Sequence, residues 1–267
     1  PYIREEMISG DCTRFVRNEN YWGEAPYYDE VVIKYIPEAS SRLQALQTGE
    51  VDLIYGADLL SYDDYNQALS LDGIEGAIND GNTLTRNLVL NASSEILSDL
   101  KVRQAIAYAV NKEEITEGLT YGYETPATSL FAPGAPYTDI TYNSTWSYDL
   151  DKANALLDEA GWLMGSNGIR EKDGQKLNLD LLYNSDSVTE KSIAEYLQSE
   201  YQSIGIALNI HGEEEQSYRD NMKAGNFSMV FNICWGMPYD PQSSLAAMRA
   251  PVYGDFAAQQ GLEDKTE

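Results

Sequence analysis

Apolar positions in the second half of the chain follow two periods, one typical of strands and one typical of helices. Strands are expected at 177–183, 206–211 and 227–233, and helices with one apolar face are expected at 190–204 and 214–224. Gly205 directly follows the first of these helices and predicts its end. Strands and helices that alternate through short connections indicate an α/β fold, here of mixed α+β character.

The first part of the chain contains fewer regular patterns. Strands are expected at 27–37, 51–55 and 84–90, and helices are expected after Ser40 or Ser41, within 57–82, at 99–110 and after Asp149. Either serine could cap the first helix, and Gly49 is expected to end it. Residues 125–147 lack periodicity and predict a long loop, whereas Gly165–Gly174 predicts a hairpin-like turn.

The chain is expected to divide near residues 80–83, where a helical pattern gives way to a glycine-containing connection. This boundary assigns residues 1–82 to part of a first lobe and residues 83–267 to most of a second lobe. The length of 267 residues suits one large domain or two lobes of modest size.

Charge excludes some classes of partner. The formal net charge of −25 repels phosphate backbones and anionic headgroups, so nucleic acid is not expected as a partner. It attracts cationic ligands at long range, but it equally serves solubility. No run of roughly 18 apolar residues is available to span a bilayer. The first ten residues also show no signal-peptide pattern.

The residues that most enzymes need are missing from the sequence. His211 is the only histidine, which excludes a histidine-rich zinc site, and it is expected to be an ordinary packed or surface residue. Cys12 and Cys234 are too far apart for a short-spaced metal motif and are expected to be two buried thiols. Neither a GxGxxG nor a phosphate-binding loop motif is present. We therefore do not expect an enzyme or a bound cofactor.

Aromatic side chains are the most informative candidates for ligand binding. The sequence has 20 tyrosines and four tryptophans, and Trp235, Tyr239 and Tyr253 lie in or after the stretch CWGMPYDPQSS. Pro238 and Pro241 prevent regular structure there, so Trp235 and Tyr239 are expected just beyond a strand, facing a cleft. They could instead pack only against the edge of a lobe.

Long motifs identify a resemblance to a family. The segment FVRNENYWGEAPYYDEVVIKYIPEASSRLQALQTGEVDLIYG, with the later blocks KVRQAIAYAVNKEEI, LFAPGAPY, KANALLDEAGW, GIREKDGQKL, WGMPYDP and DFAAQQGL, resembles the extracytoplasmic solute-binding proteins of peptide and nickel ABC importers. The blocks follow the order found in the nickel-binding branch. The resemblance covers nearly the whole chain.

This resemblance implies a two-lobed, periplasmic-binding-protein-like fold that traps its ligand between the lobes. It also implies further sequence before Pro1 and after Glu267, so the first lobe of this chain is expected to be incomplete. We refer to that longer protein as the full-length protein. The resemblance implies ABC transporter permease subunits as partners, and a periplasmic or cell-surface protein that meets the membrane only through a lipid anchor or the permease.

Site residues follow from the same resemblance. Trp235 and Tyr239 match an aromatic pair that lines the pocket in the nickel-binding branch. Tyr253, in MRAPVYGDF, stands where that branch places a histidine. Neutral phenol is a weak metal donor, because its pKa is near 10. The expected ligand is therefore nickel already held in a chelate.

The sequence also allows two other functions. The first is a di- or oligopeptide-binding protein of the same family, which would need partners for both peptide termini. The second is a secreted carbohydrate-binding or carbohydrate-active module, which would need aromatic platforms and a suitably spaced carboxylate pair. For a binding protein, lobe closure is expected to hinge near 80–86 and 232–236.

Overall fold

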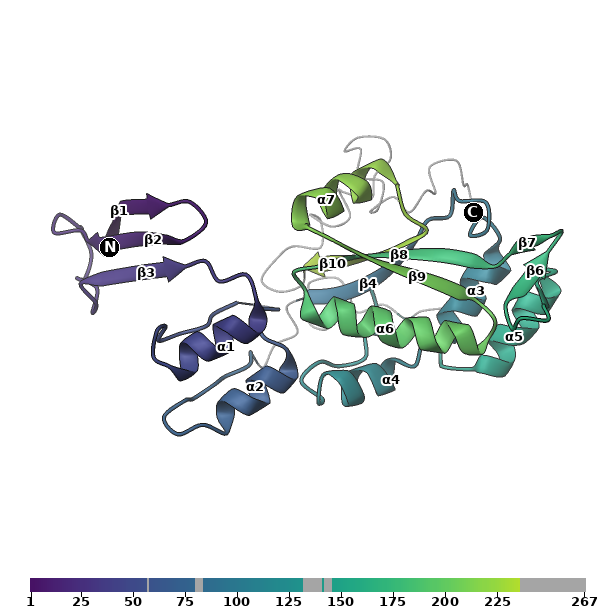
Figure 1. Ribbon diagram of the computed structural model, residues 1–267, viewed down its shortest axis with the longest axis horizontal. Coiled ribbons are helices and arrows are strands. Elements are labelled where there is room, and N and C mark those ends of the chain that lie inside the picture. Colours follow the sequence, from purple (N-terminus) through teal and green to yellow (C-terminus); the bar gives the residue numbers. More distant parts are fainter. Residues whose placement is uncertain (57, 80–83, 132–140, 142–145, 236–267) are drawn as a thin grey trace. The chain divides into compact units, whose positions relative to one another are not determined.

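The computed structural model describes residues 1–56, 58–79, 84–131, 141 and 146–235 (Figure 1). These residues form helices and strands in both parts of the chain, which confirms the mixed α/β class. Two compact units are present, residues 1–74 and residues 75–267.

In the first unit, an antiparallel sheet of order β1-β2-β3 precedes two helices. These elements are β1 (Tyr2–Ile8), β2 (Cys12–Arg17), β3 (Glu30–Lys34), α1 (Ala39–Gln47) and α2 (Tyr62–Leu69). The expected strand at 27–37 and the first two expected helices are confirmed. The strand expected at 51–55 is wrong, because these residues have no ladder partner, and β1 and β2 were not expected. The serine cap of α1 is also wrong, since Glu38 occupies the N-cap position without a side-chain hydrogen bond.

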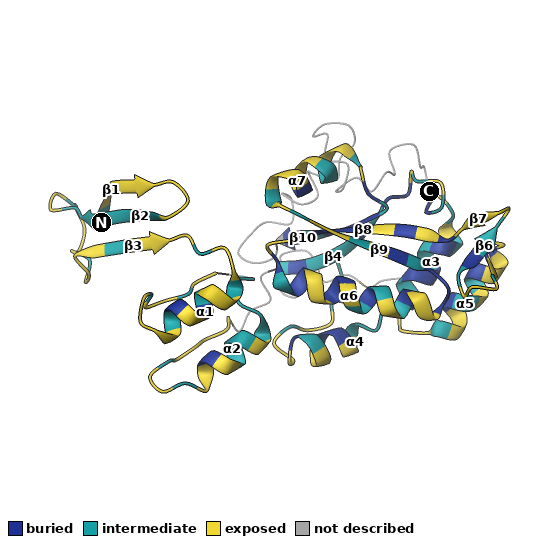
Figure 2. Cartoon of the chain, in the orientation of Figure 1, coloured by how far each residue is buried: buried dark blue, intermediate teal, exposed yellow. Residues whose placement is uncertain are grey.

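The first unit buries little apolar surface (Figure 2). Its buried hydrophobic residues are Leu43, Ala45 and Ala68, all on the helices. Large apolar side chains remain exposed around the sheet, among them Trp22 at 91% and Tyr27 at 90%. A sheet normally buries at least one face against another layer. The exposed sheet is therefore consistent with a lobe whose remaining layers lie outside this chain.

The second unit is built on a four-stranded sheet of order β4-β10-β8-β9. Its strands are β4 (Leu84–Leu90), β8 (Asn178–Asn184), β9 (Ala207–Glu213) and β10 (Met229–Trp235). Strands β10, β8 and β9 are parallel, and β4 runs antiparallel to β10 with Leu84 opposite Trp235. This confirms all four strands expected in this part of the chain.

Helices cover both faces of the sheet (Figure 1). The helices of the second unit are α3 (Leu100–Tyr108), α4 (Lys112–Glu114), α5 (Leu150–Glu159), α6 (Val188–Ser203) and α7 (Glu215–Ala224), with a π-helical turn at Ile115–Leu119. Helix α6 lies on one face and α7 lies on the other. The carboxylate of Asp149 accepts a hydrogen bond from the backbone amide of Lys152, which confirms the expected cap of α5. Asp99 caps α3 in the same way by accepting from the amide of Lys101, and this cap was not predicted.

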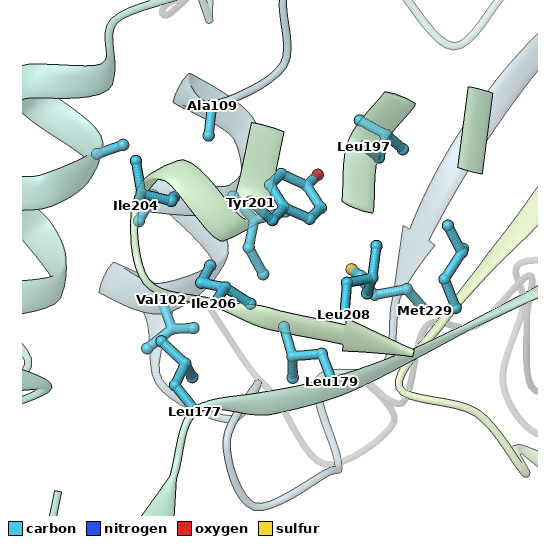
Figure 3. Close-up of a cluster of buried hydrophobic side chains, with 14 of the residues drawn as sticks. Val102, Ala109, Leu177, Leu179, Leu197, Tyr201, Ile204, Ile206, Leu208 and Met229 are labelled. Carbon is cyan, nitrogen blue, oxygen red and sulfur yellow. The ribbon is translucent and has the colours of Figure 1, made fainter. Parts of the chain in front are cut away.

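The main hydrophobic core lies between the sheet and the layer that contains α3, α5 and α6 (Figure 3). Leu177, Leu179, Ile206 and Met229 come from the sheet strands or the residues that begin them, and each is at most 1% exposed. A smaller cluster on the opposite face joins Val89, Leu182, Phe227 and Val230 to Tyr218 of α7. The sheet is thus fixed from both sides.

A small antiparallel sheet of order β5-β6-β7 lies beyond α5. It contains β5 (Leu163–Met164), β6 (Arg170–Lys172) and β7 (Gln175–Lys176), which confirms the hairpin-like region expected at 165–174. Of the long loop expected at 125–147, residues 132–140 and 142–145 lie outside the described part of the chain. Its described residues form no helix or strand. Within the described ranges, no helix is long and apolar enough to cross a membrane.

Tyr201 of α6 places a polar hydroxyl group inside this hydrophobic core. Its side chain is fully buried, and its hydroxyl has no hydrogen-bond partner among the described residues. Burial raises the pKa of this hydroxyl. Tyr201→Phe removes a buried polar group without a partner, so we expect the free energy of unfolding to rise by up to about 1 kcal/mol. Urea denaturation followed by circular dichroism measures this change.

Tyr218→Phe is the matched control. The Tyr218 hydroxyl is also buried, but it donates a hydrogen bond to the carbonyl oxygen of Phe231. Removing that donor is expected to destabilise the protein by about 1 kcal/mol. Equal effects of the two substitutions would contradict this account.

Candidate ligand-binding edge of the sheet

The ends of three parallel strands meet at one side of the sheet. Asn184 is opposite Glu213 in the ladder between β8 and β9, and β10 ends at Trp235. Since β4 is antiparallel to β10, it begins on this same side at Leu84. We call this side, defined by Asn184, Glu213, Trp235 and Leu84, the carboxyl edge. In open α/β sheets, ligands bind outside the carboxyl ends of the strands, so this edge is the candidate site.

The aromatic residues singled out from the sequence lie at this edge or follow it in the chain. Trp235 is the last residue of β10, and its backbone pairs with Leu84 of β4. Its side chain is not among those described. Tyr239 and Tyr253 lie outside the described residues. The strand extends two residues beyond its expected end at 233, so Trp235 is the last residue of β10 and does not follow the strand. Its role in binding stays a prediction.

A partly buried ion pair lies close to the carboxyl edge. Arg86 of β4 is opposite Ile233 of β10, two positions from the pair of Leu84 and Trp235. One terminal nitrogen of its guanidinium donates to both carboxylate oxygens of Glu124, at 3.1 and 3.3 Å. Only 16% of the Arg86 side chain is exposed. This ion pair was not expected from the sequence. The signal that could have indicated it is the position of Arg86, a charged residue within the apolar-rich pattern of β4.

Amide and carboxylate groups tie the end of β8 to the two helices beside it. The backbone amide of Asn184 donates to the buried carboxylate of Glu190 at 2.9 Å, and its side-chain amide donates to Glu215 at 2.6 Å. Ser187 caps α6 by accepting from the amide of Glu190 at 3.2 Å. Carboxylates in the first turns of α6 and α7 suit the positive ends of the helix dipoles. These acids therefore stabilise the edge.

Glu213 is held in the same manner at the end of β9. One of its carboxylate oxygens accepts from the Ser217 hydroxyl at 2.5 Å and from the Asn221 side-chain amide at 2.7 Å. Burial, followed by the nearby carboxylates of Glu190 and Glu215, raises the pKa of Tyr218 on the same helix. Tyr218 therefore stays a neutral donor at physiological pH and adds no charge to the edge.

The only histidine is a surface residue, as expected from the sequence. The Nε2 atom of His211 lies 3.2 Å from a carboxylate oxygen of Asp180 on the neighbouring strand, and both side chains are more than half exposed. They border an open depression of about 330 Å³ that also reaches Glu213 and Phe227. In the described part of the chain, no three His, Cys, Asp or Glu residues are grouped so that they could hold a metal ion. Cys12 and Cys234 form no disulfide with each other, and Cys234 is buried as expected. Cys12 is only partly buried, so the expected burial is wrong for this residue.

Comparison with known proteins places this fold in a family. The family model described as bacterial extracellular solute-binding proteins, family 5 middle, matches residues 1–255. The nickel-binding periplasmic protein of Escherichia coli (strain K12) is 39% identical over 267 residues, which cover 99% of this chain and 51% of that protein. The oligopeptide-binding protein OppA of Lactococcus lactis subsp. lactis is 30% identical, over 96% of this chain and 46% of that protein.

A solved structure extends the likeness to three dimensions. The crystal structure of NikA from Brucella suis in complex with Fe(III)-EDTA superposes with a TM-score of 0.86 at 37% sequence identity. The match covers 99% of this chain and 53% of that one. The chain thus spans about half the length of the relatives that it matches.

Proposed function

The chain belongs to the bacterial extracellular solute-binding proteins of family 5, and from this membership we propose that the full-length protein is the substrate-binding component of an ABC importer. Its cargo in this proposal is nickel, carried as a metal chelate and enclosed between two lobes. The nickel chelate is cargo, and no resident cofactor is part of the proposal. A solute-binding protein captures its ligand without changing a covalent bond, so no enzymatic activity is proposed.

The single observation that carries the nickel assignment is the similarity to nickel-binding relatives along almost the whole chain. The E. coli relative is named for nickel binding, and the Brucella suis relative holds a metal chelate, Fe(III)-EDTA. The only histidine of this chain, His211, lies beside Asp180 on the neighbouring strand. The resemblance to the nickel-binding branch implies that Tyr253 stands where that branch has a histidine. Recognition of a preformed chelate needs no imidazole ligand from the protein, because an aromatic pocket can enclose an organic chelator.

The proposed binding site uses the carboxyl edge of the sheet. Trp235, Tyr239 and Tyr253 are proposed to line the pocket, with Trp235 positioned by the last ladder pair of β10. Residues 1–82 and 83–267 are proposed as parts of two lobes that close about hinges near 80–86 and 232–236. Both hinges border this edge, because the start of β4 and the end of β10 are paired there.

The cellular setting follows from the same proposal. An extracellular solute-binding protein delivers its ligand to the permease subunits of an ABC transporter, so docking on a permease is proposed for the closed form. Location in a periplasm or on the cell surface is part of the proposal, with a lipid anchor or the permease as the contact to the membrane.

Peptide binding is the alternative that a specific observation favours. The Lactococcus relative, an oligopeptide-binding protein, is 30% identical over 96% of this chain. A peptide would require charged partners for its two termini, whereas a chelate would require a closed aromatic pocket with a partner for its carboxylates. Membership of the solute-binding family leaves the carbohydrate-active alternative without support.

Calorimetric titration of the full-length protein separates the two ligands. We expect heat of binding when nickel and histidine are added together, little heat with nickel alone, and none with a mixture of dipeptides. Binding of dipeptides without metal would replace the nickel proposal with the peptide alternative. Equal binding of nickel with and without histidine would contradict the chelate.

A further inference from the structure

Arg86 occupies an unusual place for a charged side chain. It stands in the apolar-rich strand β4, opposite Ile233, at the end of the ladder where the proposed hinges meet. Its side chain is 16% exposed, and that of Glu124, its partner, is 30% exposed. Removing one member of a partly buried ion pair leaves the other charge with less solvation than it would have on an open surface. The position of one residue therefore strongly constrains the position of the other.

Glu124 is itself held in place from its own side of the pair. Its backbone amide donates to the Thr120 hydroxyl oxygen at 3.3 Å. Thr120 is fully buried, and its hydroxyl donates to the carbonyl oxygen of Thr116 at 2.6 Å. The amides of Gly122 and Tyr123 donate to the carbonyl oxygens of Thr116 and Thr120, at 2.8 and 2.9 Å. Glu124 thus projects from a firmly bonded turn.

The same turn contains a strained residue. Tyr121 has a φ of +54°, in the left-handed region that residues other than glycine rarely adopt. Such a conformation persists only where the surrounding structure holds it. Here the hydrogen bonds of Thr120 hold the turn on one side, and the ion pair with Arg86 holds it on the other. The turn directly follows a π-helical segment, Ile115–Leu119, a type of irregularity often found at functional sites.

We propose that Arg86 and Glu124 are a positioning pair that fixes the start of β4 at the carboxyl edge and thereby sets the affinity for the ligand. This inference rests on the proposed function, because it takes residues 84–86 as part of a hinge. The pair acts through the backbone of β4 and through the ladder to Trp235, without touching the ligand. Binding requires the Leu84 and Trp235 ends of the two strands to stay in register, and an ion pair two positions away keeps them so.

The effect on affinity is expected to be moderate and local. Changes in residues that act at a distance typically alter binding by about 3- to 30-fold. We therefore expect Arg86→Gln and Glu124→Gln to weaken ligand binding within that range. The reversed pair, Arg86→Glu with Glu124→Arg, restores opposite charges and is expected to recover much of the loss. Arg86→Lys keeps the charge but not the planar guanidinium, so it should lie between wild type and Arg86→Gln.

The test uses the full-length protein and two measurements. Hydrogen exchange of the amides in 84–90 and 229–235, made without ligand, reports directly on the ladder between β4 and β10. Titration with nickel plus histidine, and separately with dipeptides, reports on affinity. Lys101→Gln is the matched control, because it breaks an ion pair with Glu159 at 3.0 Å between α3 and α5, away from these strands.

We expect exchange in 84–90 and 229–235 to become about tenfold faster in Arg86→Gln and Glu124→Gln, corresponding to loss of one local interaction. It should stay unchanged in Lys101→Gln and recover in the reversed pair. Unchanged exchange in both single variants would overturn the inference, and so would an equal increase across residues 84–235. If Arg86→Gln does not fold, Arg86→Lys and Glu124→Gln decide the same question.

The two proposals fail in different ways. A wild-type protein that binds neither nickel–histidine nor dipeptides would refute the proposed function, while the exchange measurement would still test whether the pair fixes the ladder. A wild-type protein that binds its ligand, with single variants that bind equally well, would overturn the positioning role alone.

Discussion

Trp235→Ala in the full-length protein is expected to weaken binding of nickel–histidine by roughly 10- to 100-fold, the size typical of a buried aromatic residue at the centre of a binding site. Trp235 ends the central strand β10, whose backbone is fixed by antiparallel pairing with β4. The ladder therefore fixes the backbone position from which the proposed pocket residue projects, and a fixed backbone lowers the entropy lost on binding. Isothermal titration calorimetry measures the change.

Two further variants show whether the loss belongs to the aromatic surface at this position. Trp235→Phe keeps a smaller ring and is expected to retain part of the affinity. Trp146→Ala removes a tryptophan that packs edge-on against Tyr108, with ring centroids 5.1 Å apart. Helix α6 begins at the carboxyl edge and runs away from it, and Tyr148 donates to Glu200 in its last turn. Trp146, two residues before Tyr148, therefore lies near the far end of α6. Trp146→Ala should therefore leave the affinity unchanged, and an equal loss in both alanine variants would argue against a pocket at Trp235.

The α/β alternation of the second unit could be predicted because local signals and tertiary packing agree there. Leu177, Leu179 and Leu181 alternate with polar residues and are all buried in the main core, and Gly205 adopts a φ of +81° at the end of α6. The two strands missed in the first unit are different. Strand β1 reads YIREEMI, in which charged residues interrupt the apolar pattern, and its pairing with β2 rather than its own composition makes it a strand.

Contacts between distant residues limit what could be predicted of the site. The aromatic stretch after β10 was visible because Trp235, Tyr239 and the prolines are adjacent in the sequence. The ion pair of Arg86 and Glu124 joins residues 38 positions apart, and it depends on the left-handed turn at Tyr121. No sequence period encodes either feature. The strand expected at 51–55 shows the converse, because a β-prone composition forms no strand without a neighbour to pair with.

Arg170 explains why the small sheet beyond α5 has a fixed position. Its side chain is 3% exposed, and its guanidinium donates to one carboxylate and to several backbone and side-chain oxygens, among them the Asn154 carbonyl at 3.5 Å. The shorter bonds go to the carbonyls of Ile204 at 2.8 Å and Trp162 at 2.6 Å, the Asn154 side-chain oxygen at 2.7 Å, and Asp158 at 2.5 Å. One residue of β6 thus joins α5 to the turn between α6 and β9.

Arg170→Met is expected to lower the free energy of unfolding by about 3 kcal/mol, because methionine fills similar volume but leaves several buried acceptors without a donor. The turn at Gly205 packs closely on this side chain, because a Cβ atom added at Gly205 would lie 2.8 Å from the Cγ atom of Arg170. Urea denaturation measures the loss. Arg219→Met is the control: its ion pair with Glu215 is exposed, so its removal should cost less than about 0.5 kcal/mol. Equal midpoints for the two variants would show that the buried guanidinium contributes no more than a surface one.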